Sequence, residues 1–149
     1  MKLEASSEIK QFGKKPHIQK GFYHAILKEI KLSEDESKYG KQVIFLFEID
    51  HKDHPVLATK AHYLYRNQDG TYKTAINPGT RSGKIFGALG YNFEGQIETD
   101  KLIGNSVEVL IDDYEYDFED FSTKKKEKLT GSAIKEVNKL RMFTEENVK

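Results

Sequence analysis

Three stretches decide the fold: GFYHAILKEIKL at residues 21–32, QVIFLFEID at residues 42–50 and PVLATKAHYLY at residues 55–65. Each is rich in the β-branched and aromatic residues that strands favour, and polar turn segments separate them. In the first stretch Tyr23, Ala25 and Leu27 share one face, after which Ile30 and Leu32 become the apolar positions. A change of face within a strand is typical of a β-bulge. The pattern therefore predicts three consecutive strands, the first of them bent.

A short helix is predicted after the third strand. The turn NPGT at residues 77–80 precedes a segment in which Ile85 and Leu89 lie on one helical face. Thr80 suits the N-cap of this helix, and Gly90 stands where a C-terminal cap belongs.

The end of the chain supplies the remaining elements. Residues 106–111 (SVEVLI) alternate as a fourth strand, whereas Ile134, Val137 and Leu140 have a spacing that suits a short helix as well as a bulged strand. Three strands, a helix, a strand, a charged loop and a last strand is the order of an OB-fold, a five-stranded Greek-key barrel with a helix between strands 3 and 4. The sequence thus predicts a mainly β, OB-fold-like barrel, with a plain antiparallel sandwich as the alternative.

The composition excludes several classes of protein. The 149 residues include no cysteine, which excludes disulfides, thiol catalysis and cysteine-ligated zinc and fits the cytoplasm, or the host cytoplasm of a viral protein. Mean hydropathy is -0.69, and no stretch approaches the roughly 18 apolar residues of a membrane span. Residues 1–7 have no apolar core behind a basic region, so we expect no secretion signal.

The predicted organisation is one domain with an uneven charge distribution. We expect an N-terminal arm at residues 1–20, an OB-like domain at 21–140 with a charged loop at 112–130, and a tail at 141–149. The whole chain has 24 basic and 24 acidic side chains, but residues 112–120 (DDYEYDFED) hold six of the acidic ones and no basic one. The rest of the chain is therefore basic, which permits a phosphate-binding surface.

Two runs resemble a family of small viral proteins. GFYHAIL at residues 21–27 has a G-x-Y-x-A pattern, and it leads through the K-x-G-K turn at residues 38–41 to an apolar second strand. The segment GKIFGALG at residues 83–90 adds a Gly- and Lys-containing helix that ends near ALG. In these features the chain resembles small phage and archaeal-virus replication-associated proteins. The resemblance implies an OB-fold that binds single-stranded DNA, or a domain of unknown function.

Aromatic and basic residues near the second and third strands are the candidate nucleic-acid site. Single-strand binders stack bases on aromatic rings within a basic groove. The candidates are Lys41, Phe45, Phe47, Lys60, Tyr63, Tyr65, Arg66, Tyr72, Lys73, Arg81 and Lys84. Phenylalanines of a central strand usually fill a core, so a structural role is the alternative for Phe45 and Phe47.

The other motifs in the sequence do not identify a phosphate-binding loop, a metal site or a catalytic site. Residues 79–85 (GTRSGKI) depart from the phosphate-binding loop, because three residues separate the glycines and isoleucine follows the lysine. The cluster DHKDH at residues 50–54 is interpreted as a turn, so we predict no metal site and no cofactor. No catalytic histidine arrangement can be argued, and we predict that the protein is not an enzyme.

The acidic stretch allows three interpretations: a hairpin with solvated carboxylates, a contact for a basic protein partner, or a mimic of DNA charge. The candidate partner-binding residues are Asp112, Asp113, Tyr114, Tyr116, Phe118 and Asp120. We expect the lysines that follow, at residues 124–128, either to hold a nucleic-acid strand or to balance this acidic charge.

We expect non-catalytic binding of single-stranded DNA, or of RNA, with little sequence preference, in replication, recombination or repair. The alternative is a protein-interaction module that uses residues 112–121, with a replication protein as partner. A carbohydrate-binding sandwich has little support, because the chain has no tryptophan. No membrane partner is expected.

Overall fold

The first three strands form where the sequence predicts them. The computed structural model describes residues 15–120 and 122–140. Its first strands are β1 (Gly21–Leu32), β2 (Gly40–Ile49) and β3 (Val56–Arg66). The register between β1 and β2 skips Lys28, since Leu27 lies opposite Phe47 and Glu29 opposite Leu46. The predicted bulge in the first strand is therefore confirmed.

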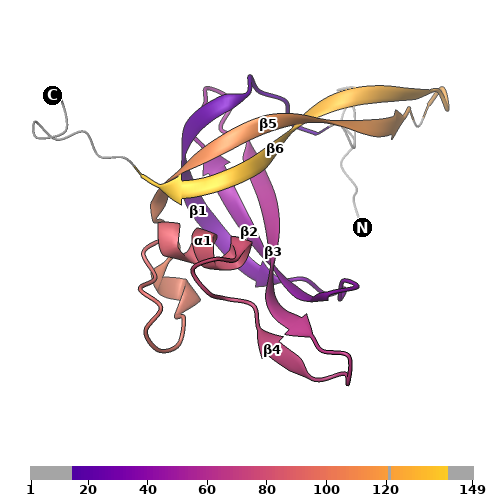
Figure 1. The fold of residues 1–149 in the computed structure, drawn as a ribbon. Coiled ribbons are helices and arrows are strands. Elements are labelled where there is room, and N and C mark those ends of the chain that lie inside the picture. Colours follow the sequence, from indigo (N-terminus) through magenta and orange to yellow (C-terminus); the bar gives the residue numbers. More distant parts are fainter. Residues whose placement is uncertain (1–14, 121, 141–149) are drawn as a thin grey trace, which may run out of the picture.

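The complete sheet is open and antiparallel, and it has six strands (Figure 1). The other elements are β4 (Tyr72–Thr74), α1 (Arg81–Ala88), the 3-10 turn η1 (Thr99–Lys101), β5 (Ser106–Glu119) and β6 (Lys126–Lys139). The strand order is β4-β3-β2-β1-β5-β6. A mainly β fold is confirmed, but the predicted five-stranded barrel is wrong. Strands β3 and β6 lie in contact without being hydrogen-bonded neighbours in this order.

The core lies between the concave face of the sheet and α1. Alternate side chains of β2 point inward, and Phe45 and Phe47 are 0% exposed. The ring of Phe86 meets Phe45 edge-on, with 5.1 Å between the ring centroids. Ile85 and Leu89 are also buried in this cluster. The predicted apolar face of the helix is therefore what joins α1 to the sheet.

Helix α1 has the predicted caps. The Thr80 hydroxyl accepts a hydrogen bond from the Gly83 N–H at 3.1 Å, as an N-cap side chain does. Gly90 has a φ of 109°, and the Tyr91 N–H bonds back to the Phe86 carbonyl at 2.9 Å. This left-handed glycine ends the helix, as glycine commonly does at this position.

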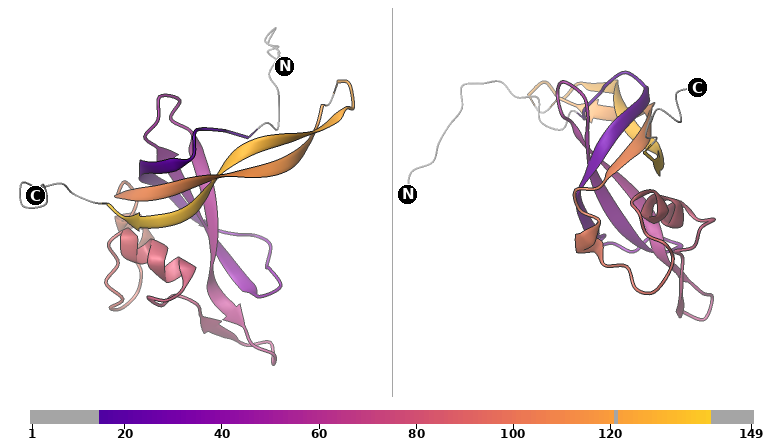
Figure 2. Two further views of the ribbon diagram at one scale, coloured as in Figure 1. Left: turned by 45° about the horizontal axis from the view of Figure 1, so that its top comes forward. Right: turned by 90° about the vertical axis from the view of Figure 1, so that its left-hand side faces the viewer.

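Beyond Ile111, β5 and β6 leave the body of the sheet as a two-stranded arm, which we define as residues 112–119 and 126–131 (Figures 1 and 2). Of the three interpretations of the acidic stretch, the structure shows the hairpin, because strand pairing continues through Glu119 opposite Lys126. Most of the segment predicted as a charged loop at 112–130 is therefore paired strand. The stretch DYEYDFE alternates acid and aromatic residues, and this period of two is itself a strand pattern. The last apolar segment is likewise a strand rather than a helix.

The part of the N-terminal arm that is described lies against β6. The Ser132 N–H donates to the Pro16 carbonyl at 3.0 Å, and the Ile18 N–H donates to Ser132 Oγ at 2.8 Å. Ile18 is buried in the core. Residues 1–14 and the predicted tail at 141–149 lie outside the described residues. Within the described part of the chain, no helix has the length and apolarity needed to cross a membrane.

Candidate nucleic-acid interface

The outward side chains of β2 and β3 form a surface, here called the outer face. Because side chains alternate along a strand, the residues of β2 between the buried ones point away from the core. Across the two strands, these outward residues form the opposed pairs Gln42 and His62, Ile44 and Lys60, and Leu46 and Ala58. Lys31 of β1 extends the middle row, since it lies opposite Ile44.

A second bulge brings a tyrosine to this face. Lys41 lies opposite Leu64, but Gln42 lies opposite His62, so the register skips Tyr63. Tyr63 packs against the core, whereas the ring of Tyr65 lies 5.6 Å from the ring of His62. The extra residue therefore separates the two tyrosines, which simple alternation would place on one face.

Tyr39, His62 and Tyr65 form an aromatic cluster at one end of the outer face. Tyr39 is 62% exposed, and its ring meets His62 edge-on at 6.4 Å. The three residues line a shallow hollow of about 520 Å³. Flat rings open to solvent can stack on other planar groups.

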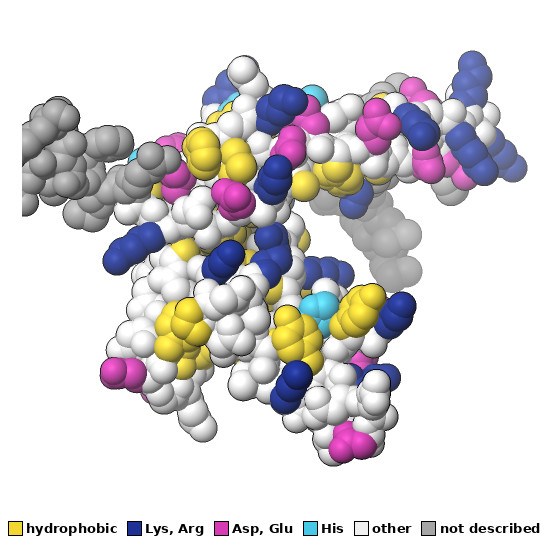
Figure 3. Space-filling view, in the orientation of Figure 1, with side chains coloured by type: hydrophobic (Ala, Val, Ile, Leu, Met, Phe, Trp, Pro, Cys, Tyr) yellow, Lys and Arg dark blue, Asp and Glu magenta, His cyan; other side chains and the backbone are white. Residues whose placement is uncertain are grey.

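Cations and amides surround the aromatic cluster. The hollow is also lined by Lys38, Arg66, Asn67, Gln68 and Lys73. The Lys38 ammonium lies 5.3 Å from the centre of the Tyr39 ring. Figure 3 shows this arrangement near β3 and β4, where a histidine lies between apolar side chains with Lys and Arg around them. The site can therefore offer rings to a base and ammonium groups to phosphates.

The loop between β1 and β2 is tied to the cluster by Ser37. Its hydroxyl donates to the Gly40 carbonyl at 3.0 Å and lies 2.6 Å from His62 Nε2. A hydroxyl has one hydrogen to donate, so we assign the second bond as donation from His62 Nε2–H. The hydroxyl also accepts from the Tyr39 N–H at 3.3 Å. Ser37 therefore fixes both the ring of His62 and the start of β2.

An ionic cluster on the opposite face of the same sheet end adjoins the hollow through Arg66, which also lines it. Arg66 is opposite Tyr72 in the ladder, and both side chains bond the carboxylate of Glu36. The Tyr72 hydroxyl donates to Glu36 Oε1 at 2.6 Å, and Lys41 Nζ lies 4.8 Å from the centre of the Tyr72 ring. The Tyr72 hydroxyl, followed by Arg66, holds the pKa of Glu36 below its ordinary value. Tyr72, followed by Glu36, raises the pKa of Arg66.

We expect Tyr72→Phe to raise the pKa of Glu36 toward its ordinary value of 4.5, because the hydroxyl is the largest cause of the lowering. Since the pKa is lowered by folding, the contact stabilises the protein above the ordinary value and is lost as pH falls through the folded pKa. NMR titration of the Glu36 carboxyl carbon measures the change. Tyr39→Phe, which alters the other face, should leave it unmoved; equal shifts in both variants would contradict the assignment.

The structure separates the predicted nucleic-acid residues into different places. Lys60, Tyr65 and Lys73 lie on the outer face or its hollow. Phe45 and Phe47 are fully buried, so their prediction as stacking residues is wrong. Where both alternating sets of a strand are apolar, the set with the larger rings fills the core.

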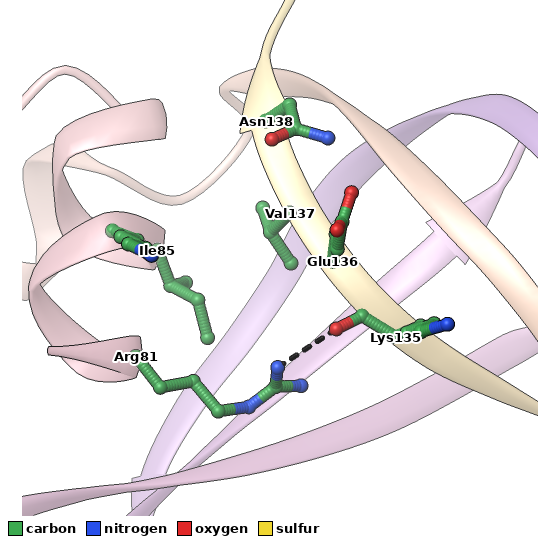
Figure 4. A pocket seen from close by; sticks show the side chains of 7 residues that line it. Arg81, Ile85, Lys135, Glu136, Val137 and Asn138 are labelled. Carbon is green, nitrogen blue, oxygen red and sulfur yellow. Dashed lines mark hydrogen bonds between the residues drawn. The ribbon is translucent and has the colours of Figure 1, made fainter.

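Arg81 is also removed from the candidate site. Its guanidinium donates to the carbonyls of Lys135 at 2.9 Å and Ile134 at 3.2 Å on β6 (Figure 4). It also reaches β3, where it donates to Thr59 Oγ1 at 2.5 Å and to the Lys60 carbonyl at 3.4 Å. The predicted phosphate contact of Arg81 is wrong, because its guanidinium instead links β3 and β6, which do not pair with each other.

A bulge in β6 prepares the site for Arg81. The register places Glu136 opposite Leu110 and Ile134 opposite Ile111, so it skips Lys135. An extra residue turns two successive carbonyls toward the same edge of a strand. The planar guanidinium of Arg81 can donate to both carbonyls at once, which the single ammonium of a lysine could not do.

Lys84 lies apart from the aromatic cluster. It is exposed on α1 and lines a hollow of about 320 Å³ with Ile85, Val137 and Asn138 (Figure 4). Lys41 and Tyr72, by contrast, belong to the ionic cluster behind the outer face. Arg66 takes part in both places, because it bonds Glu36 and also lines the hollow of the aromatic cluster.

The predicted partner-binding residues lie on or beside the arm. Asp113 Oδ1 lies 3.0 Å from His17 Nε2, and Asp112 lies 3.9 Å from the Lys135 ammonium. Asp120 Oδ1 accepts from the Ser122 N–H at 2.9 Å and so shapes the turn of the hairpin.

The aromatic side chains alternate with these acids. The rings of Tyr114 and Tyr116 lie 5.7 Å apart, and Phe118 follows two residues later on the same strand face. Asp113, Glu115 and Asp117 point the other way and are exposed.

Sequence reasoning missed the residues that complete the site: Lys31, Lys38, Tyr39, Gln42, Ile44 and His62. The alternation of β2 contained the necessary signal for Gln42 and Ile44, because the other set was the more aromatic. The position of Tyr39 and His62 beside Tyr65 depends on the bulge at Tyr63, and the pattern of apolar residues in the third strand did not predict this bulge. Comparison of the chain with known protein families and with curated proteins found no match.

Proposed function

We propose that this protein binds single-stranded nucleic acid, DNA first, without catalysis and with little sequence preference. The observation that supports this most is the aromatic cluster of Tyr39, His62 and Tyr65, which is open to solvent and bordered by Lys38 and Lys73. Rings that stack on any base, next to cations that attract phosphates, give binding without sequence readout. DNA replication, recombination or repair is the process we propose for it.

The proposal includes an OB-fold-like origin of the sheet. Strands β1, β2, β3, β5 and β6, with α1 before β5, follow the OB order, and β4 adds a short hairpin. OB-folds bind oligonucleotides on the face of their second and third strands and on two adjoining loops. In this proposal the outer face and the loop at residues 33–39 are the counterparts of those binding surfaces. The Arg81 link between β3 and β6 takes the position of barrel closure in this proposal.

The arm supplies a second basic region in the same proposal. Lys124, Lys125, Lys126 and Lys128 are exposed at and near its turn. The arm projects from the body (Figure 2), so its lysines can meet phosphates of a strand that continues past the outer face. Such contacts would add to the salt dependence of binding through counterion release.

We expect Tyr65→Ala to weaken binding to a labelled oligothymidine of ~30 nucleotides by about 5- to 150-fold, the range of one lost base stack. Fluorescence anisotropy at low and moderate salt measures this, with duplex DNA as the comparison. Phe93→Ala is the matched control, because Phe93 is 36% exposed and packs against Tyr91. Equal losses in the two variants would argue against stacking at Tyr65, and no binding of single strands at low salt would overturn the proposed function.

A protein-interaction module is the second candidate function. The arm supports it, because a projecting ribbon with acids on one face and aromatic side chains on the other offers a contact surface at residues 112–121. Phe121 itself lies outside the described residues. Neutralising Asp113, Glu115 and Asp117 should strengthen DNA binding if the first proposal holds. Loss of a protein contact, with no DNA binding by any variant, would favour the second.

A further inference from the structure

We infer that Glu36 is a positioning residue for the aromatic cluster, so that this carboxylate favours the binding of a polyanion. The inference rests on the proposed function. A carboxylate beside a phosphate-binding surface is expected to repel the ligand, so its contribution here has the opposite sign from simple electrostatics.

Glu36 is anchored on the face of the sheet opposite the outer face. Glu36 is bonded by the side chains of Arg66 and Tyr72, which are opposed residues of β3 and β4. Charge-assisted bonds of this kind are stronger and more directional than neutral ones. The carboxylate therefore anchors the loop at residues 33–39 to the β3–β4 hairpin.

Ser37, one residue further along the loop, is held by a hydrogen bond on the outer face. Ser37 bonds the ring of His62, and the Arg66 N–H donates to the Tyr39 carbonyl at 2.9 Å. Residues 36–39 are thus held from both faces of β3. The exposed ring of Tyr39 depends on these bonds, because the ring itself has only the edge contact to His62 and the nearby Lys38 ammonium among the contacts described.

Removing the charge of Glu36 has two opposing effects on the binding of a polyanion. Glu36 is exposed, so water and salt screen its repulsion of a phosphate on the other face of the sheet. Releasing the loop, in contrast, leaves the ligand to order Tyr39 and Lys38 when it binds. We conclude that the loss of preorganisation outweighs the loss of repulsion.

The test compares two neutralised glutamates of the same loop. Glu36→Gln should weaken oligothymidine binding by about 3- to 10-fold, as expected for side chains that the ligand must order. Glu34→Gln removes an equal charge from an exposed neighbour, and it should bind as tightly as the wild type or slightly more tightly. The salt dependence of the Glu36→Gln variant should match that of the wild type, because the phosphate contacts are unchanged.

A spectroscopic readout separates positioning from charge. Hydrogen exchange of the backbone amide of Arg66 reports its hydrogen bond to the Tyr39 carbonyl. This exchange should be faster in Glu36→Gln than in the wild type and unchanged in Glu34→Gln. Wild-type binding with equal affinities for the two variants would overturn this inference alone. Absence of wild-type binding would overturn the proposed function, and unchanged Arg66 exchange would then show independently that Glu36 does not hold the loop.

Discussion

The Gly83→Ala variant is expected to lose about 3 to 5 kcal/mol of its free energy of unfolding, at the upper end of single-residue effects. A Cβ at this position would lie 1.6 Å from the carbonyl oxygen of Asn77 and 2.4 Å from its carbonyl carbon. Both atoms belong to backbone, so no side-chain rotation can relieve the overlap. The turn at residues 77–80 and its Thr80 cap must move away from α1 to make room. Urea unfolding followed by circular dichroism measures the loss.

Gly87→Ala is the matched control in the same helix. Its Cβ would meet only the Phe93 ring, at an ordinary contact distance of 3.4 Å. Alanine is the better helix former, so this variant should be unchanged or more stable by up to about 1 kcal/mol. Equal destabilisation of the two variants would show that the close approach of Asn77 is not what demands glycine at position 83.

The Arg81→Met variant is expected to lose about 2 to 4 kcal/mol of unfolding free energy, since several hydrogen bonds to a charged donor disappear together. The guanidinium links β6, through the carbonyls of Ile134 and Lys135, to Thr59 and Lys60 of β3. Methionine keeps much of the aliphatic length but leaves these carbonyls without the donor. Hydrogen exchange along β6 should accelerate as well, because the strand loses its link to β3.

Lys84→Met provides the comparison one turn further along α1. Lys84 is exposed, and its side chain forms no hydrogen bond or ion pair with the part of the chain that the structure describes, so a change within about 0.5 kcal/mol is expected. Arg81→Lys should recover only part of the stability, because an ammonium cannot form the planar fork. Full recovery by lysine would mean that charge alone, rather than the fork geometry, links the strands.

Local signals predicted much of the fold. The alternation of the first three strands is strong because each buries one face, and the change of phase after Leu27 reported a real bulge. The Thr80 and Gly90 caps were also recognisable, since each residue solves a backbone problem that few others solve. These features are properties of short segments and could be read without the rest of the molecule.

What failed depends on contacts between distant segments. Barrel closure was assumed from element order, but in the structure β3 and β6 do not pair, and the Arg81 side chain bonds both strands instead. A hairpin was one of the interpretations of the acidic stretch, but the sequence did not give its register, in which Asp117 lies opposite Lys128 and Glu119 opposite Lys126. Cross-strand pairing of opposite charges lets a strand remain ordered without a core beneath it.

The candidate site was found only in part for a similar reason. Tyr65 was selected as a half-exposed strand residue, and the structure places it in the hollow. Tyr63 was paired with it by alternation, but the bulge turns Tyr63 to the core. Tyr39 lies in a predicted turn, and its approach to His62 is produced by the return of the chain into β2, which sequence spacing does not report.

The position of β1 in the middle of the sheet has a consequence for how the protein folds. Strands β1 to β4 pair with their neighbours in sequence, and β5 pairs with β6. Among the strands described, the pairing of β1 with β5 alone joins distant segments, with Gly21 opposite Ile111. Closing so long a segment costs entropy before its contacts form, which slows folding. We therefore expect two units, β1 to β4 and the hairpin of β5 and β6, to form early and to dock in the slow step. The outer face of β2 and β3 would then be assembled wholly within the first unit.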